Sequence, residues 1–258
     1  MADVRVEVDG VVTTIWLDRP DRRNAVDRGM AAELLAAFED FERDAGQRVA
    51  VLAGTGGTFC AGADLTAVDD PERRNEIDGE GGPMGPTRMA LGKPVIAAVS
   101  GYAVAGGLEL ALLADLRVVE RDAVLGVFCR RWGVPLIDGG TARLPRVVGL
   151  GRALDLILTG RPVDAAEALA MGLANRVVEP GAAVRAAREL ASQIAAFPQR
   201  CVLVDRASTY AGLDLPLAEA LAAEGAAGIP VVAGEGAAGA ARFSAGAGRH
   251  GSFGADQA

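Results

Sequence analysis

The chain has 258 residues, of which 50% are hydrophobic and 23% are charged, as in ordinary globular proteins with a buried core. Its 26 Lys and Arg are outnumbered by 34 Asp and Glu, and the net charge of −8 argues against a general nucleic-acid binder. One histidine and three widely spaced cysteines argue against a Ser-His-Asp triad, a zinc site and a disulfide framework, and they indicate a reducing compartment, which we expect to be the cytoplasm.

The N-terminal region predicts a β-hairpin followed by a helix. Its first ten residues, MADVRVEVDG, lack the apolar segment of a signal peptide, and no run of about 18 apolar residues predicts a transmembrane helix anywhere in the chain. Residues 4–8 and 11–17 alternate in polarity around Asp9-Gly10, a pair that favours a hairpin turn. Asp27 is placed to cap a helix. The apolar residues of that helix recur at helical spacing, at Met30, Leu34, Phe38 and Phe41.

Three short apolar runs, at residues 48–54, 94–99 and 116–119, predict buried strands. Helical stretches alternate with these runs, and such alternation implies crossover connections, mostly parallel pairing and hence an α/β fold. Between the first two runs, residues 68–87 are charged, rich in Gly and Pro and without periodicity. A loop of this length inside a compact domain is usually functional or disordered.

The C-terminal part is predicted to be helical and is rich in small residues. One helix face is expected to carry Val184, Ala187, Leu190, Ile194 and Phe197. Between residues 218 and 248, 20 of 31 residues are Ala or Gly, whose side chains bury little area. We expect this tail to gain order by packing on another surface, such as a second subunit.

Two glycine-rich turns follow predicted strands, at residues 54–65 and 100–110. In the second turn, Gly106 and Gly107 begin a predicted helix over residues 107–113. The first N–H groups of a helix have no internal partner, and glycine lets a phosphate, a carboxylate or an oxyanion approach them closely. For either turn alone, the alternative is tight packing of a helix on a strand. The chain has no P-loop lysine and no strand-anchored G-x-G-x-x-G, so a nucleotide-phosphate site is not supported.

Several longer motifs occur together in a fixed order. They are CAGADL at 60–65, KPVIAAVSGYAVAGGLEL at 93–110, ADLR at 114–117, GGTARLPRVVG at 139–149, LTGRPVDAAEA at 158–168 and GLANRVV at 172–178. With these motifs, residues 1–200 resemble the crotonase (enoyl-CoA hydratase/isomerase) superfamily, whereas the Ala- and Gly-rich tail resembles it weakly.

This resemblance implies an α/β core domain over residues 1–200, built as a crotonase-like spiral of ββα repeats, and an α-helical oligomerisation region over residues 201–258. It implies a coenzyme A thioester as substrate and a homotrimer or dimer of trimers, with no metal, redox cofactor, nucleic acid or membrane. It also implies that the backbone N–H groups of Ala63 and Gly106 bind the thioester oxygen. Negative charge develops on that oxygen when an enolate forms, and losing one such donor typically costs about 3–4 kcal/mol.

Glu109 is the predicted catalytic acid/base. It lies about one helical turn beyond Gly106, from where a carboxyl group could reach a water molecule at the β-carbon of the substrate. The alternative is a solvated helix carboxylate. Because residues 108–113 are otherwise apolar, we favour burial and function.

At two positions the chain departs from the hydratases of the family. Where they carry a second Glu, this chain has Cys129, which could be a weak proton donor or a small buried hydrophobic residue, and we favour the second role. Asp138 precedes Gly139-Gly140 in a turn where some family members that hydrolyse, isomerise or remodel acyl-CoAs place an Asp. It is predicted to cap the following helix, to act as a second acid/base, or to do both.

For the coenzyme A end, Arg22 and Arg23 resemble the basic part of the family's R-P-x-x-x-N-A element, while Thr66 replaces a lysine that is usual in the family. The resemblance also assigns substrate contacts to Ala61, Asp64, Leu65, Cys129 and Trp132. Met84 and Phe128 are further candidates for the acyl pocket, although for Phe128 we favour ordinary core packing. Arg130 and Arg131 are expected to pair with Asp138 or with a substrate carboxylate, or to face solvent. Arg242, Arg249 and His250 could be supplied by a neighbouring subunit, but we favour solvated charges of the tail.

The leading expectation is therefore syn hydration of a trans-2-enoyl-CoA. In this reaction Glu109 removes a proton from water, the two N–H groups hold the enolate, and a proton returns to the α-carbon. One alternative is isomerisation, hydrolysis or decarboxylation with Asp138 as a second acid/base. Another is a paralogue that binds acyl-CoA with little activity.

Overall fold

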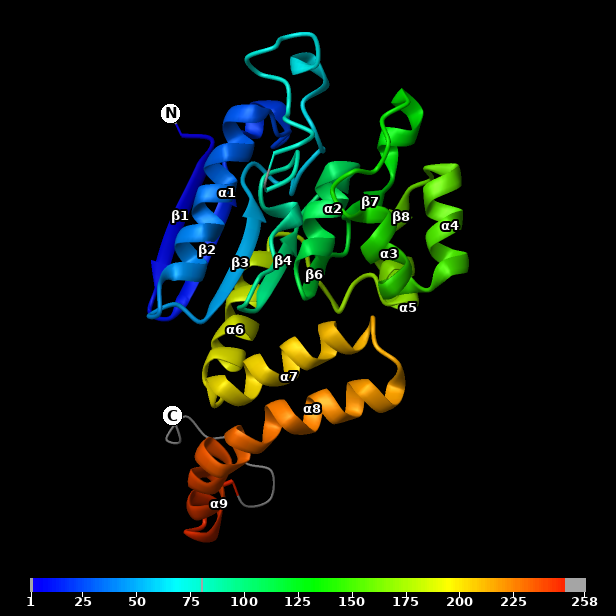
Figure 1. The fold of residues 1–258 in the computed structure, drawn as a ribbon. Helices are drawn as coiled ribbons and strands as arrows, with labels where there is room; N and C mark the ends of the chain where they lie inside the picture. Colours follow the sequence, from blue (N-terminus) through cyan, green and yellow to red (C-terminus); the bar gives the residue numbers. More distant parts are fainter. Residues whose placement is uncertain (1, 80, 249–258) are drawn as a thin grey trace. The chain divides into compact units, whose positions relative to one another are not determined.

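The computed structural model describes residues 2–79 and 81–248 of the chain (Figure 1). The strands in these residues are β1 (Val4–Asp9), β2 (Val12–Leu17), β3 (Val49–Gly54), β4 (Val95–Val99), β5 (Tyr102–Val104), β6 (Leu116–Glu120), β7 (Val124–Gly126), β8 (Val163–Asp164) and β9 (Arg176–Val178). The α-helices are α1 (Arg28–Arg43), α2 (Gly106–Leu113), α3 (Gly140–Val148), α4 (Leu150–Thr159), α5 (Ala165–Met171), α6 (Ala183–Ala195), α7 (Gln199–Gly212), α8 (Leu217–Val231) and α9 (Ala237–Ser244). Short helical turns are η1 (Pro20–Arg22), η2 (Leu65–Ala67), η3 (Pro86–Arg88), η4 (Phe128–Trp132) and η5 (Val232–Gly236).

Two sheets organise the strands. The larger has the order β1-β2-β3-β4-β6-β9, and the smaller has the order β5-β7-β8 (Figure 1). In the larger sheet β1 and β2 are antiparallel, and all other neighbours are parallel, as the α/β prediction requires. Since parallel neighbours end at the same edge of a sheet, the segments that leave β3 and β4 start close together.

The predicted hairpin and first helix are present. β1 pairs with β2 up to Asp9↔Val12, so the loop consists of Gly10 and Val11, one residue later than the Asp9-Gly10 pair suggests. Gly10 adopts a φ of 58°, which favours glycine. Asp27 caps α1 by accepting a hydrogen bond from the Met30 N–H at 3.2 Å. The four predicted apolar positions of α1 are all buried.

The core contains the predicted strands β3, β4 and β6 and the whole of α2. All eight residues of α2 are buried, and Glu109 is the one charged residue among them. A helix that is apolar all round is expected to be buried, as this one is. Strands β5, β7, β8 and β9 were not predicted, because runs of two or three residues are too short to show a periodicity.

The loop over residues 68–87 is largely irregular, as predicted, but hydrogen bonds attach it to α1 and its N-terminal approach. The Arg73 carbonyl accepts from the Arg28 N–H at 2.9 Å. The Asn75 amide donates to the carbonyl oxygens of Val26 at 3.2 Å and Pro83 at 2.7 Å. The described part of this loop therefore has a defined path.

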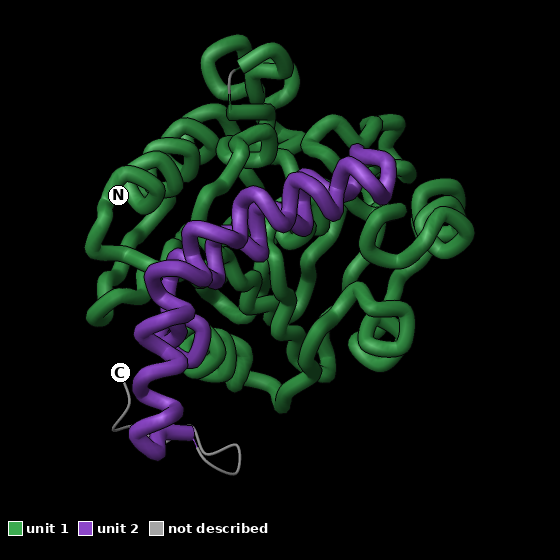
Figure 2. The backbone as a smooth tube through the Cα atoms, turned by 60° about the horizontal axis from the view of Figure 1, so that its bottom comes forward, with its two compact units in different colours: residues 1–191 green, residues 192–258 purple. Residues whose placement is uncertain are grey.

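The chain forms two compact units, Met1–Ala191 and Ser192–Ala258, which Figure 2 colours separately. The boundary lies inside α6, earlier than the expected division after residue 200. Ala187 and Leu190 of α6 are buried as predicted. Phe197 follows the end of the helix and is exposed, so its placement on the buried face was wrong.

The second unit contains a long and largely apolar helical run. Within the described residues, the helical run Leu217–Ser244 is long and apolar enough to cross a membrane by length and composition alone, and little of it is buried. One such helix is weak evidence for a membrane. The same exposed apolar surface is expected of a helix that packs against a second subunit.

Candidate active site

The backbone N–H groups of Ala63 and Gly106 lie where the segments after β3 and β4 meet. A short parallel bridge between Cys60 and Ala103 joins these segments. A Cβ atom on Gly62, whose φ is 99°, would lie 3.0 Å from the Gly106 nitrogen, so the segments approach closely. Within residues 2–79 and 81–248, neither the Ala63 N–H nor the Gly106 N–H donates a hydrogen bond. Both residues line the same cavity, as the predicted oxyanion site requires.

The residue that precedes α2, Ala105, has an unusual backbone conformation. Ala105, which precedes the helix, has φ 54° and ψ −127°, a region that costs a residue with a side chain about 1–3 kcal/mol. A Cβ on Gly107 would overlap the Cys60 carbonyl oxygen, and one on Gly106 would lie 2.8 Å from the Met84 sulfur. The two glycines therefore let α2 approach these neighbours, and packing around Ala105 maintains the strained turn.

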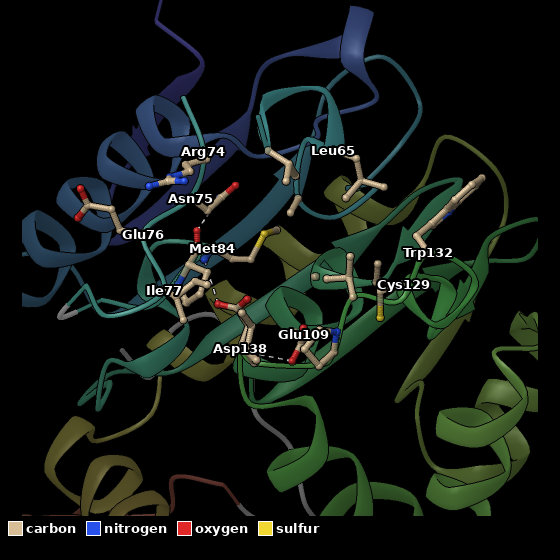
Figure 3. A pocket seen from close by; sticks show the side chains of 18 of the residues that line it. Leu65, Arg74, Asn75, Glu76, Ile77, Met84, Glu109, Cys129, Trp132 and Asp138 are labelled. Atoms are coloured by element: carbon tan, nitrogen blue, oxygen red, sulfur yellow. Dashed lines mark hydrogen bonds between the residues drawn. The ribbon is translucent and has the colours of Figure 1, made fainter. Parts of the chain in front are cut away.

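The cavity beside these N–H groups has a volume of about 1090 Å³. Eight of the predicted site residues line it: Ala61, Ala63, Leu65, Gly106, Glu109, Cys129, Trp132 and Asp138. Met84 lines it, in agreement with its predicted place, and so does Phe128, for which core packing was the favoured expectation. Figure 3 shows Glu109 beside Asp138, with Cys129 on the other side of Glu109, toward Trp132.

The carboxyl group of Glu109, a residue of α2, is buried against the N-terminus of α3 and is not solvated. Its side chain is 2% exposed, and Oε1 accepts hydrogen bonds from the N–H groups of Asp138 at 2.9 Å and Gly140 at 2.7 Å. Burial raises the pKa of Glu109 from 4.5 to about 7, a change that the two N–H donors oppose and the Asp138 charge assists. A carboxyl group with this pKa can both accept and release a proton near neutral pH.

Asp138 does not cap α3, and that alternative was wrong. The N-cap residue is Gly139, which has no side chain to accept a hydrogen bond. The Asp138 carboxylate is directed to the loop instead, where Oδ1 accepts from the Met84 N–H at 2.9 Å and from the Thr87 hydroxyl. Burial raises the pKa of Asp138, while hydrogen bonds from Thr87 and Met84 act in the opposite direction.

Cys129 lies in η4 and is 7% exposed, with its side chain on the cavity wall (Figure 3). Burial and the nearby Glu109 charge raise the pKa of the Cys129 thiol, so the neutral form is favoured. A neutral thiol cannot replace a carboxylate as a base. It fits the expected role of a small hydrophobic wall residue.

The residues expected to bind coenzyme A lie in different places. Arg22 and Arg23 are exposed and do not line the cavity. Asp64 is also absent from the cavity wall, because its carboxylate forms ion pairs with Arg19 at 3.1 Å and Arg73 at 3.3 Å. Its interactions are structural, and the motif that contains it gave no sign of these partners.

Two cations on the cavity wall, Arg28 and Arg74, were not predicted. Arg28 donates to the Arg74 carbonyl at 3.1 Å and lies 3.4 Å from a Glu76 carboxylate oxygen. Arg28 is the first residue of α1, and Arg74 lies in the loop over residues 68–87. The position of Arg74 depends on the path of the loop, which has no periodicity that a sequence could show.

Of the other charged candidates, Arg130 and Arg131 contact groups other than Asp138. Arg130 donates to the Ile157 carbonyl at 3.0 Å and Arg131 stacks on Phe128, so the suggested pairing with Asp138 is not formed. Arg242 lies in α9 of the second unit. Arg249 and His250 lie outside the described residues. Among residues that are described, no group of three His, Cys, Asp or Glu side chains could hold a metal ion.

Comparison with known proteins identifies relatives over most of the chain. The model of the enoyl-CoA hydratase/isomerase family matches residues 7–227. A carnitinyl-CoA dehydratase of Proteus mirabilis is 42% identical over 188 residues, which cover 72% of each protein. An (E)-benzylidenesuccinyl-CoA hydratase of Thauera aromatica is 36% identical over 217 residues, which cover 83% of this chain and 84% of that protein.

Solved structures with the same architecture are also similar in sequence. The crystal structure of an enoyl-CoA hydratase from Mycobacterium tuberculosis matches with a TM-score of 0.89 and 36% identity, covering 95% of this chain and 96% of that one. A carnitinyl-CoA dehydratase from Mycobacterium avium matches with a TM-score of 0.78 and 37% identity, covering 82% and 83% of the two chains.

Proposed function

Because this chain belongs to the enoyl-CoA hydratase/isomerase family, we propose that it adds water to the double bond of a trans-2-enoyl-CoA thioester. The observation that carries this proposal is the position of Glu109. Its buried carboxyl group, with a pKa of about 7, lines the same cavity as Ala63 and Gly106, whose N–H groups donate to no other described residue. A base and an oxyanion site in one cavity are what addition of water to an enoyl thioester requires.

In the proposed reaction, Glu109 takes a proton from water as the water oxygen bonds to the β-carbon. The electron pair of the double bond moves toward the thioester carbonyl, where the N–H groups of Ala63 and Gly106 stabilise the negative oxygen. The α-carbon then takes the proton from Glu109, so that one water molecule has been added and the carboxylate is regenerated. The reverse sequence is dehydration.

The relatives support a reaction of this type. The relatives from Proteus mirabilis and Thauera aromatica are a carnitinyl-CoA dehydratase and an (E)-benzylidenesuccinyl-CoA hydratase, respectively. Addition and removal of water share one transition state. We therefore infer a 2-enoyl-CoA or its 3-hydroxyacyl-CoA as substrate, with no resident cofactor and with the cytoplasm as the site of action.

A second candidate is isomerisation, hydrolysis or decarboxylation with Asp138 as another acid/base. One observation favours it. Both hydrogen bonds to the Asp138 side chain use Oδ1, and no described residue donates to Oδ2, although Asp138 lines the cavity. A third candidate is an acyl-CoA-binding protein with little activity, for which the replacement of a second Glu by Cys129 is the argument.

The test is to follow the ultraviolet absorbance of the conjugated enoyl group when crotonyl-CoA is mixed with the protein. We expect absorbance to fall with the wild type. The isosteric Glu109→Gln variant is expected to lose at least 100-fold in kcat, because its amide cannot take a proton from water. Binding of crotonyl-CoA to both proteins, measured by calorimetry, is the control. Binding without any loss of absorbance would reject hydration and favour the other candidates.

A further inference from the structure

Asp138 connects the loop to the rest of the site through its side chain. Its Oδ1 accepts from the Met84 N–H at 2.9 Å and from the Thr87 hydroxyl, across 54 and 51 residues of sequence. A Cβ on Gly82 would approach the Thr87 hydroxyl within 2.5 Å, so this part of the loop is closely packed. The end of the loop, residues 82–88, is therefore attached to Asp138 rather than free over the cavity.

Arg143 strengthens the same attachment from α3. One guanidinium nitrogen donates to the Asp138 carbonyl at 3.0 Å, and another donates to the Thr87 carbonyl at 2.7 Å. Two side chains therefore join the loop to the start of α3. The carboxylate of Asp138 accepts hydrogen bonds from the loop, and the guanidinium group of Arg143 donates one to it. Neither Arg143 nor Thr87 lines the cavity, so neither is in a position to touch the substrate there.

The backbone N–H of Asp138 binds Glu109, on the side away from the loop. This N–H donates to Glu109 Oε1 at 2.9 Å, beside the bond from Gly140 (Figure 3). One residue therefore binds the loop with its carboxylate and the catalytic carboxyl group with its N–H. Met84, which the carboxylate holds by its N–H, packs over Gly106.

From these contacts we infer that Asp138 is a positioning residue, which makes the orientation of Glu109 depend on the attachment of residues 82–88. The inference rests on the proposed hydration, in which Glu109 is the acid/base. It assigns Asp138 no proton transfer with the substrate. When the loop is attached, Met84 completes the wall beside Gly106 and Glu109 is held in place at the same time.

Several charged groups surround this pair. The guanidinium groups of Arg88 and Arg143 act on the Asp138 carboxyl, and the thiol of Cys129 is near Glu109. Both arginines lower the pKa of Asp138, whereas the Asp138 charge raises that of Glu109. Neutralising Asp138 is therefore expected to lower the pKa of Glu109, so that Glu109 stays ionised to lower pH.

Two substitutions of Asp138 separate positioning from proton transfer. Asp138→Asn removes the charge but keeps an oxygen that accepts from Met84 and Thr87. Asp138→Ala removes both. The readouts are the pH profile of kcat with crotonyl-CoA and hydrogen exchange of residues 82–88 followed by mass spectrometry. The same pair of substitutions at Asp155, an exposed residue of α4, is the control for general effects of these changes.

We expect Asp138→Asn to lower kcat by less than tenfold and to move the acid limb of the pH profile to lower pH. We expect Asp138→Ala to lower kcat by more than tenfold and to accelerate exchange in residues 82–88. Equal losses of 100-fold or more in both variants would overturn the inference, since they would make Asp138 a proton donor or acceptor. Wild-type kcat in Asp138→Ala would overturn it as well.

Thr87 provides a second test if Asp138→Ala does not fold. Thr87→Val removes the hydroxyl donor, and we expect a several-fold loss of kcat with little change in KM and with faster exchange of the loop. Thr87→Ser restores the donor and should recover most of the loss. If the wild type does not act on enoyl-CoA, the proposed function fails, and hydrogen exchange of residues 82–88 then decides the inference alone. Faster exchange in Thr87→Val, with wild-type exchange in Thr87→Ser, would support the inference. The same exchange rate in both variants would reject the inference.

Discussion

Glu109 determines how the proposed reaction should depend on pH. Only its ionised form can take a proton from water, and its pKa is raised to about 7 by burial. We therefore expect kcat/KM to fall about tenfold for each pH unit below about 7. A profile of initial rates between pH 5 and 9 would measure this limb. A limb near 4.5 would mean that an ordinary exposed carboxyl group controls the rate.

The same residue should make the protein less stable at high pH. The pKa of Glu109 is 4.5 when exposed and about 7 in the fold, so the folded state binds more protons between these values. Stability from the neutral form is fully present below pH 4.5 and is lost as the pH rises through 7. We expect Glu109→Gln to raise the free energy of unfolding by up to about 3 kcal/mol at pH 8 and by little at pH 4.5.

Urea unfolding of the wild type and Glu109→Gln at both pH values would measure this difference. An equal effect of the substitution at pH 4.5 and pH 8 would contradict the link to ionisation. The comparison also separates stability from activity, because the variant that loses turnover is the one expected to be more stable.

Ala105 is the strained residue of the site. Its φ of 54° and ψ of −127° suit glycine, so we expect Ala105→Gly to raise the free energy of unfolding by about 1 kcal/mol. We also expect kcat to fall, because the adjacent Gly106 N–H is then held less firmly. Urea unfolding and crotonyl-CoA turnover are the measurements. A less stable variant would show that the Ala105 methyl group contributes more through packing than the backbone loses through strain.

At the level of elements, the position of α2 depends on Gly107. A Cβ there would overlap the Cys60 carbonyl oxygen, which belongs to backbone and cannot rotate away. We expect Gly107→Ala to destabilise the protein by about 1–3 kcal/mol or more and to reduce activity by displacing the start of the helix. Gly151→Ala is a matched control, because Gly151 lies in exposed α4 with open space around it. It should change the free energy of unfolding by less than about 1 kcal/mol.

Periodic and capped elements could be predicted from sequence because their signals are local. Asp27 and the apolar residues of α1 lie within one helix, and the continuous apolar run around Glu109 indicates a buried α2. Asp138 shows the limit of this approach. An Asp before Gly-Gly has the local pattern of a cap, yet its partner Thr87 lies 51 residues away in a loop without periodicity. Tertiary hydrogen bonds of this kind leave no local signal.

The same reasoning applies to the candidate site. Ala63, Gly106 and Glu109 could be placed in advance because their motifs are specific and follow parallel strands. Asp64 could not, because a carboxylate next to the site can equally turn away to bind Arg19 and Arg73. Arg74 reaches the cavity only through the path of the loop, which brings it beside Arg28 at the start of α1.

For the whole molecule, exposed leucines suggest contacts between copies of the chain. Leu150, Leu154 and Leu158 form one stripe on α4 of the first unit, and Leu217 and Leu221 lie exposed on α8 of the second. Such apolar surface is usually covered. We expect a solution mass of about three or six times the chain mass of 26.3 kDa, by light scattering after size exclusion.

Leu221→Glu should lower that mass, because a carboxylate is costly to bury in an apolar contact. The exposed loop substitution Asp69→Asn is the control, and it should leave the mass unchanged. A wild type with the mass of one chain would contradict the expected trimer. The helical run Leu217–Ser244 would then need a different partner for its apolar surface.

The groups proposed to activate the thioester are main-chain N–H groups, and this has an evolutionary consequence. Most substitutions at residues 63 and 106 retain an N–H, so activation can be lost only by moving the backbone or introducing proline. The side chains at 109, 129 and 138 can vary around that fixed activation, although they influence one another. New reactions can therefore arise from very few mutations, and a library restricted to these three positions is an economical starting point for directed evolution.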